Sequence, residues 1–168
     1  MQINFEKVRF TNFLSFGSHP TEIQLNAYKS SLVTGTNFAG KSSAILDTVT
    51  FALFGKAFRQ INKPQLINMY NGKDCLVELT FRKNNISYLV RRGIKPNIFE
   101  IYKDGKKFDI LSNARDQQAE FEKTVLNFSY QTFQQIVVLG SANYIPFMRL
   151  KPQERRLIVD DILNLHVF

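Results

Sequence analysis

The sequence is poor in the residues that build disulfides and metal centres. It contains one cysteine, Cys75, and two histidines, His19 and His166, in 168 residues. A single thiol excludes a disulfide within the chain, and the histidines lie too far from it in sequence to indicate a metal site. Apolar runs are much shorter than the roughly 18 to 20 residues that cross a bilayer, and the first ten residues lack the pattern of a signal peptide. We therefore expect a cytoplasmic protein with no membrane segment.

Acidic residues are also scarce. The chain has 14 Asp and Glu against 22 Lys and Arg, which gives a net charge of +8 and an isoelectric point of about 9.7. This balance favours a polyanionic partner, such as nucleic acid or nucleotide, and says nothing about the fold. With 44% hydrophobic residues and no internal repeat, the chain is long enough for one domain or lobe with its own core.

The sequence does contain a phosphate-binding pattern. Residues 35–42, GTNFAGKS, match G-x-x-x-x-G-K-[ST]. In this pattern Gly35 and Gly40 let the backbone wrap closely around phosphates. Lys41 reaches the terminal phosphates, and the Ser42 hydroxyl ligates Mg²⁺. The loop therefore predicts a site for a nucleotide with Mg²⁺.

The flanking sequence supplies the context that the pattern needs. Residues 31–33 lead into the loop as a strand, and residues 44–53 are apolar on most sides, as in a helix buried beneath a sheet. Gly55 suits the end of that helix. Strand, loop and helix thus come in the required order.

The rest of the chain divides into strands and then helices. Alternating apolar residues predict strands at 3–10 and 21–26 and an antiparallel meander at about 75–111, with Asp104-Gly105 as a hairpin turn. Helices are expected from 112 or 113 to about 126 and from Pro152 onward, and Ser129 opens a further short element that ends near 140. The last helix has an apolar stripe, Ile158, Ile162 and Leu165, that we expect to continue in a longer parent or against another chain.

Two further segments resemble nucleotide-binding motifs. The run LIVDD, residues 157–161, could be a strand that ends in a Mg²⁺-binding Asp160. Its helical periodicity favours instead a solvated helix face on which the carboxylates are bystanders. The segment NKPQ, residues 62–65, resembles a guanine-reading motif, but Gln65 stands where a carboxylate is needed. GTP recognition is therefore not expected.

Several segments together resemble the SbcC-type ATPases of the SMC superfamily, and most of all its branch from large tailed phages. NFLSF, GTNFAGKSS, FGKAFRQINKPQLIN, FQQIVVLGSANYIPFM and KPQERR occur in the order typical of the N-terminal lobe of an ATPase head. The resemblance implies an α/β phosphate-loop lobe of the ABC/SMC type at residues 1–150, which includes a Q-loop-like segment at 136–148. Residues 151–168 would start a coiled-coil helix.

The resemblance also implies cofactors and partners. ATP and Mg²⁺ would be bound, and hydrolysis and ATP-dependent dimerisation would need a C-terminal lobe and a second head in a homodimer. A nuclease subunit and double-stranded DNA would be further partners. The implied nucleotide contacts are Gly35, Asn37, Phe38, Ala39, Gly40, Lys41, Ser42 and Ser43, with Arg59 and Lys63 on the adenine side.

Three positions depart from the family pattern. Leu14 stands where many relatives have an Arg beside the phosphates, and Phe38 replaces a common loop glycine, which requires either an ordinary backbone conformation or strain. Ser141 stands where relatives carry a Gln that ligates Mg²⁺ and orients water. Ser141 could still ligate the metal, but its short reach predicts slow turnover even in a completed head.

Basic residues concentrate in the meander. As a phosphate-contacting surface they would bind DNA without reading base sequence. As the solvated side of hairpins they would have no such role. The candidates are Arg91, Arg92, Lys103, Lys106 and Lys107.

Two other functions stay open at this point. One is a self-sufficient phosphate-loop NTPase that uses Asp160. The other is a nucleotide-gated DNA-binding scaffold without hydrolysis, which the departures at Phe38 and Ser141 favour.

Overall fold

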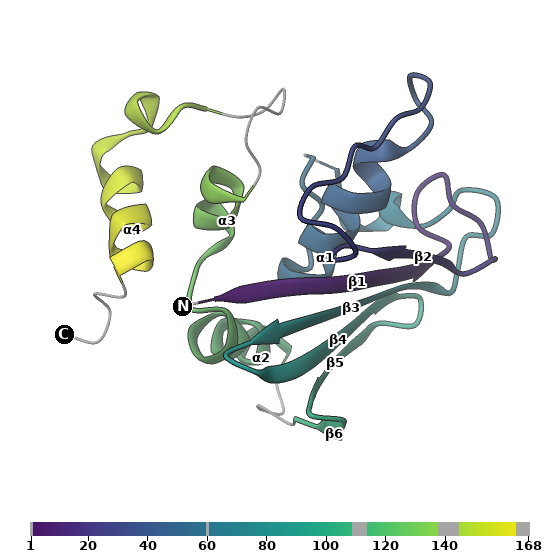
Figure 1. Ribbon diagram of the computed structural model, residues 1–168. Coiled ribbons are helices and arrows are strands. Elements are labelled where there is room, and N and C mark those ends of the chain that lie inside the picture. Colours follow the sequence, from purple (N-terminus) through teal and green to yellow (C-terminus); the bar gives the residue numbers. More distant parts are fainter. Residues whose placement is uncertain (1, 60, 109–113, 138–144, 164–168) are drawn as a thin grey trace. The chain divides into compact units, whose positions relative to one another are not determined.

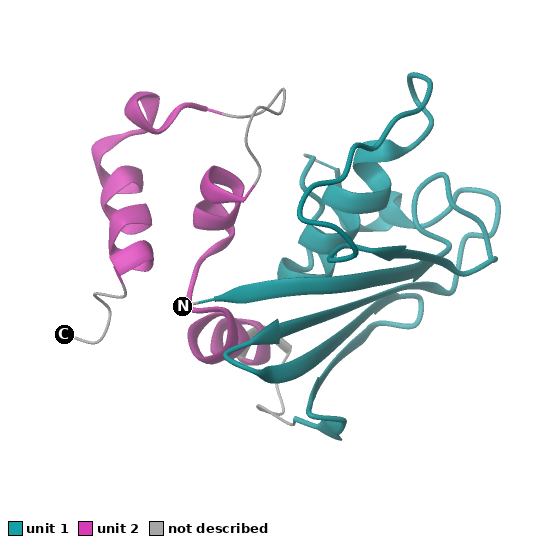
Figure 2. Cartoon of the chain, in the orientation of Figure 1, with its two compact units in different colours: residues 1–109 teal, residues 110–168 magenta. Residues whose placement is uncertain are grey.

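The computed structural model describes residues 2–59, 61–108, 114–137 and 145–163. The chain forms two compact units, Met1–Asp109 and Ile110–Phe168 (Figure 2). The predicted boundary at residue 150, between lobe and coiled-coil helix, stays a prediction. None of the described helices combines the length and the apolar composition that crossing a lipid bilayer requires.

The first unit is built on one antiparallel sheet (Figure 1). The strands are β1 (Ile3–Thr11), β2 (Thr21–Gln24), β3 (Cys75–Lys83), β4 (Ile86–Ile94), β5 (Ile98–Lys103) and β6 (Lys106–Lys107). They lie in the order β2-β1-β3-β4-β5-β6. The predicted meander therefore extends the sheet begun by β1, with Val8 opposite Leu79 in the β1–β3 register. Alternate residues of β3 are buried, as a half-buried strand requires.

Two tight turns set the register of the meander. Asn84 and Asn85 have φ of 47° and 67°, and Asp104 and Gly105 have φ of 48° and 77°. Positive φ at both central residues is the two-residue hairpin geometry that Asn, Asp and Gly favour. The Asp104-Gly105 hairpin is confirmed, and the predicted strand after it runs beyond β6 into residues outside the described part of the chain.

A helix covers one face of this sheet and forms the core with it. It begins at Lys41, passes through a π-helical turn at Ser43–Asp47 and continues as α1 (Thr48–Phe54). Every residue of α1 is buried, and α1 contacts β1, β3 and β4. Gly55, with φ of 68°, ends the helix as predicted.

The hydroxyls of the buried threonines in this helix donate to backbone carbonyls of the same helix. The Thr48 hydroxyl donates to the carbonyl of Ala44 at 2.7 Å, and the Thr50 hydroxyl donates to the carbonyl of Leu46 at 2.6 Å. Buried hydroxyls of this kind are tolerated because each has an acceptor.

The strand expected before the phosphate loop does not form. Residues 31–36 are irregular, and Leu32 and Val33 are 88% and 50% exposed. A strand needs a hydrogen-bonded neighbour, and no described strand pairs with this segment. The prediction of a strand at 31–33 is therefore wrong for the chain as it stands.

The second unit consists of helices at the expected positions. The helix predicted to end near 126 is α2 (Ala114–Glu120) with a π-helical continuation, Phe121–Leu126, and Asn127 with φ of 60° ends it. The next element is α3 (Tyr130–Ile136), in which the Ser129 hydroxyl accepts the Thr132 N–H at 3.3 Å. A short 3-10 turn, Phe147–Arg149, precedes α4 (Pro152–Leu163), so the helix predicted from Pro152 is confirmed.

The acidic pair of the LIVDD run lies within α4. Asp160 is therefore a helical residue, and the alternative in which it ends a strand and binds Mg²⁺ is wrong. Asp161 is not a bystander, because its carboxylate accepts from the Ser129 N–H at 3.0 Å and from the Thr132 hydroxyl. It thus ties α4 to the first turn of α3. On the apolar stripe, Ile158 is buried and Ile162 is exposed, while Leu165 lies outside the described residues.

Candidate nucleotide-binding site

The phosphate-loop residues line a pocket of about 480 Å³ in the first unit. Most of the predicted nucleotide contacts meet there, and the segment after β1 supplies the other wall. The lining residues are Leu14, Ser15, Asn37, Phe38, Ala39, Gly40, Lys41, Ser42, Ser43 and Arg59. Gly35 and Lys63, two of the predicted nucleotide contacts, are not among them. The Lys63 ammonium instead donates to the Asn97 side chain at 3.0 Å. Burial, followed by the nearby Arg92 charge, lowers the pKa of Lys63.

Gly40 is required at its position for two reasons. Its φ is 85°, and a Cβ atom there would lie 3.2 Å from both the Phe16 ring and the Ser15 hydroxyl. The Phe16 ring is itself held edge-on against Phe10, with centroids 4.9 Å apart. The Gly40 carbonyl accepts the Ala44 N–H at 2.8 Å, so the loop passes directly into the helix. Absence of a side chain lets the loop close against the segment after β1.

The Lys41 side chain binds back to the backbone of its own loop. Its ammonium donates to the carbonyls of Gly35 and Thr36 at 2.7 and 2.8 Å. An ammonium has three donors, so one N–H remains for an anion. Within the described residues Lys41 makes no ion pair, so its positive charge is not neutralised by a carboxylate.

The opposite wall is fixed through its backbone. Leu14 has φ of 51°, its N–H donates to the Leu66 carbonyl at 2.7 Å, and its carbonyl accepts from the Asn68 amide at 2.9 Å. Asn68 is buried and accepts two further N–H groups, from Tyr70 and Asn71, at 3.1 Å each. Leu14 therefore presents an apolar side chain at the pocket.

Phe38 has the strained form of the two conformations predicted for it. Its φ is 65°, in the left-handed region, and its side chain is 105% exposed. A bulky residue in this region is unusual, and no burial of the ring compensates for the strain.

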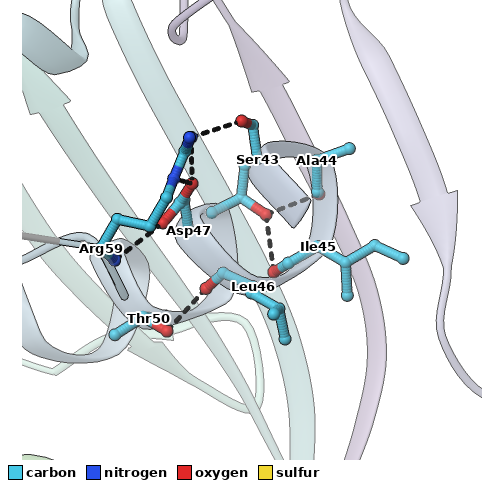
Figure 3. A network of polar contacts seen from close by, with 8 residues as sticks. Ser43, Ala44, Ile45, Leu46, Asp47, Thr50 and Arg59 are labelled. Carbon is cyan, nitrogen blue, oxygen red and sulfur yellow. Dashed lines mark hydrogen bonds and ion pairs between the residues drawn. The ribbon is translucent and has the colours of Figure 1, made fainter. Parts of the chain in front are cut away.

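Arg59 reaches the pocket through a polar network (Figure 3). Its Nε donates to Asp47 Oδ2 at 2.9 Å, its backbone N–H donates to Asp47 Oδ1 at 3.2 Å, and its Nη2 donates to the Ser43 hydroxyl at 2.6 Å. Asp47 was missed by the sequence reasoning, which treated this stretch only as a buried helix. The signal was a single carboxylate within the apolar run AILDTVTFALF.

The donors present fit a metal ion that arrives with phosphates. The hydroxyl-bearing Ser42 lines the pocket, and Mg²⁺ is commonly held by one or two protein oxygens together with phosphates and waters. Among the described residues no group of three or more His, Cys, Asp and Glu could hold a metal. Ser141, the other predicted metal ligand, lies outside the described residues, so its catalytic and metal roles stay predictions.

Residues 7–166 match a protein-family model described as AAA domain. The chain belongs to the AAA domain family. It is 46% identical over 159 residues to exonuclease subunit 2 of Escherichia phage RB69, an alignment that covers 95% of this chain and 28% of that protein. It is 30% identical over 166 residues to the DNA double-strand break repair Rad50 ATPase of Thermoplasma volcanium, with 95% of this chain and 18% of that protein covered. The chain thus spans less than a third of the length of these relatives.

Solved structures agree with the fold of this AAA domain. The Smc head domain of Pyrococcus furiosus, described with an extended coiled coil and bound to the C-terminal domain of ScpA, superposes with a TM-score of 0.62 at 19% identity. That match covers 98% of this chain and 43% of the other. A structure from work on ATP-driven dimerisation of SMC ATPases gives a TM-score of 0.60 at 19% identity and covers 95% and 99% of the two chains. The predicted resemblance to SbcC-type ATPases of the SMC superfamily, and to the N-terminal lobe of their heads, is confirmed.

The basic residues of the AAA domain differ in how available they are. Arg92 is 6% exposed, its Nε donates to the Ala52 carbonyl at 3.0 Å, and its guanidinium lies 3.7 Å from the centroid of Phe99. A buried guanidinium cannot contact a DNA phosphate, so Arg92 is removed from the predicted DNA surface. It instead caps the end of α1.

The other members of that surface fall into two groups. Arg91 pairs with Glu78 at 2.7 Å and Glu100 at 2.8 Å, and the hydrogen bond to Glu78 raises the pKa of Arg91. Its charge is already largely compensated. Lys106 and Lys107 are exposed at the tip of the last hairpin, and Lys107 lies 3.7 Å from Glu100. Lys103, at the end of β5, lies over the Phe108 ring at 5.9 Å.

Proposed function

We propose that the pocket binds Mg-ATP. The observation that carries this proposal is the joint placement of Lys41, Ser42 and the glycine loop at the start of a buried helix. The helix N-terminus and the loop N–H groups favour an anion, and the uncompensated Lys41 ammonium adds a full positive charge. Ser42 would hold Mg²⁺ together with the phosphates, and the metal would neutralise phosphate charge. Asn37, Ala39 and Ser43 would line the phosphates.

We further propose that the chain works as the N-terminal half of an ATPase head in a nuclease complex for DNA double-strand-break repair and recombination. Its similarity to a phage exonuclease subunit and to a Rad50 ATPase supports this reading. Both relatives are more than three times longer than the part aligned with this chain. The proposed partners are a C-terminal lobe, a second head, a nuclease subunit and double-stranded DNA.

The test is ATP binding and steady-state hydrolysis by the purified chain, alone and after addition of a C-terminal lobe. Lys41→Ala should abolish nucleotide binding. Lys29→Ala, which removes an exposed lysine outside the pocket, is the matched control and should leave binding unchanged. Binding by the chain alone, with turnover and ATP-dependent dimerisation only after the lobe is added, is the expected result. Turnover by the chain alone that Lys41→Ala removes would contradict the half-head proposal.

A nucleotide-gated scaffold without hydrolysis is a second candidate. The left-handed Phe38 in the phosphate loop favours it, because a bulky residue with φ of 65° strains the loop at the proposed phosphate site. The scaffold predicts dimerisation with ATP but no turnover in the completed head. If Ser141 limits turnover, Ser141→Gln should raise the rate in that head, and an unchanged rate would remove this explanation.

A further inference from the structure

Asp47 is a buried carboxylate on the helix that follows the phosphate loop. The residue is 0% exposed, and it is the last residue of the widened π-helical turn that directly precedes the buried helix α1. A buried carboxylate is unfavourable unless its charge is paired and its oxygens accept hydrogen bonds. Its presence there therefore calls for a partner of opposite charge.

Arg59 is that partner, and it occupies both carboxylate oxygens. The Arg59 backbone N–H donates to Oδ1 at 3.2 Å, while the side chain binds Oδ2 through Nε at 2.9 Å and Nη2 at 2.7 Å. The carboxylate thus fixes the backbone and the guanidinium of the same residue. A fourth contact, from Nη2 to the Ser43 hydroxyl at 2.6 Å, limits rotation of the guanidinium (Figure 3).

The same guanidinium remains accessible from the pocket. The Arg59 side chain is 45% exposed, against 1% for Asp47, and Arg59 lines the pocket with Ser43. Among the described residues, none accepts a hydrogen bond from its Nη1. A guanidinium has five donors in a fixed plane, so the edge not used by Asp47 can bind an anion.

We propose that Asp47 is a positioning residue that holds Arg59 in the orientation in which it contacts the bound nucleotide. This inference rests on the proposed binding of Mg-ATP. The alternative is an ion pair that only stabilises the fold. The two differ because positioning predicts that Asp47 affects nucleotide affinity solely through Arg59.

A double-mutant cycle in Mg-ATP affinity tests this point. Asp47→Asn removes the charge at nearly constant shape, and Arg59→Gln removes the guanidinium. Each should weaken Mg-ATP binding by about ten- to a hundredfold, the range for a lost hydrogen bond to a charged group. The double variant should bind no more than about threefold more weakly than either single variant.

Two further variants make the cycle robust. Thr50→Val removes a buried hydroxyl one turn along the same helix, without touching Arg59, and should keep affinity within about twofold of the unmodified chain. Arg59→Lys retains a positive charge for Asp47 in case Arg59→Gln does not fold, and it should still weaken binding because an ammonium cannot reproduce the planar contacts. Losses that multiply in the double variant, or Asp47→Asn with unchanged affinity, would overturn the proposal.

An NMR measurement without nucleotide separates this inference from the proposed function. The Arg59 Nε–H should be protected from exchange in the unmodified chain and lose that protection in Asp47→Asn, while Thr50→Val keeps it. An unprotected Nε–H in the unmodified chain would overturn the positioning by Asp47. A different result would reject the nucleotide site itself. In that case the Arg59 Nε–H is protected, but the chain does not bind Mg-ATP, or binds it equally well after Lys41→Ala. Any role of Arg59 in nucleotide binding would then be rejected too.

Discussion

Replacement of Phe38 by glycine should stabilise the protein. Phe38 has φ of 65°, where the Cβ atom of an L-residue crowds the following carbonyl, and its ring is fully exposed. Glycine has no Cβ atom and adopts this conformation freely. The substitution therefore removes strain from the folded state and loses no buried surface.

The expected magnitude follows from two opposing terms. A left-handed non-glycine residue costs about 1–2 kcal/mol, which glycine would recover. Glycine also gains conformational freedom in the unfolded chain, which costs about 0.5–1 kcal/mol of stability. The net gain in the free energy of unfolding lies between about 0 and 1.5 kcal/mol and centres on about 0.75 kcal/mol. In a chain of this size that raises the melting temperature by roughly 1–4 °C.

Urea unfolding of a matched series measures this effect. Phe38→Ala removes the ring but keeps the Cβ atom, so its stability should stay close to that of the unmodified chain. Phe38→Asn should lie between alanine and glycine, because Asn tolerates left-handed backbone better than other residues with a Cβ atom. If Phe38→Ala stabilises as much as Phe38→Gly, the strain does not come from the backbone, and the reasoning is refuted.

Three other predictions concern the sheet. Arg92→Met should lower the free energy of unfolding by about 1–3 kcal/mol in urea titrations, because it leaves carbonyls at the end of α1 without a donor, and it should leave DNA affinity unchanged. Burial raises the pKa of the Cys75 thiol from 9.0 to about 12. The folded chain should therefore resist a thiol reagent at pH 8 that labels the urea-unfolded chain, and rapid labelling of the folded chain would contradict this. Because the unfolded chain loses the thiol proton first, the free energy of unfolding should fall as the pH rises above 9. The last prediction concerns three lysines of the last hairpin, Lys103, Lys106 and Lys107. Neutralising all three should weaken binding to double-stranded DNA and reduce the slope of log affinity against log salt concentration by about 2 to 3. An unchanged slope would remove these lysines from the DNA surface.

Local chemistry made several features predictable from the sequence. The Asp104-Gly105 turn has its conformation because of its two residues, and Gly55 ends its helix for the same kind of reason. Alternation in β3 and the capping Ser129 of α3 are likewise properties of short segments. The phosphate loop was recognised because its glycines and Lys41 act within eight consecutive residues.

Features that depend on distant residues could not be predicted in this way. Arg92 looked like a surface cation, yet it is buried because the end of α1, some 40 positions earlier, supplies its acceptors. Asp161 looked solvated, yet Ser129 and Thr132 occupy its carboxylate. Hydrogen-bond partners at such separations are fixed only when the chain has folded.

The sequence by itself therefore indicated most of the strands, turns and helices, with residues 31–33 as the exception, and the position of the proposed phosphate loop. Tertiary structure alone decided which charges remain available to a ligand. The Arg59 side chain stays at the pocket and is 45% exposed, while Arg92 is buried. The physical reason is that a charged side chain lies where hydrogen-bond acceptors are available to it. Packing of the chain positions those acceptors, which are Asp47 for Arg59 and the carbonyls at the end of α1 for Arg92.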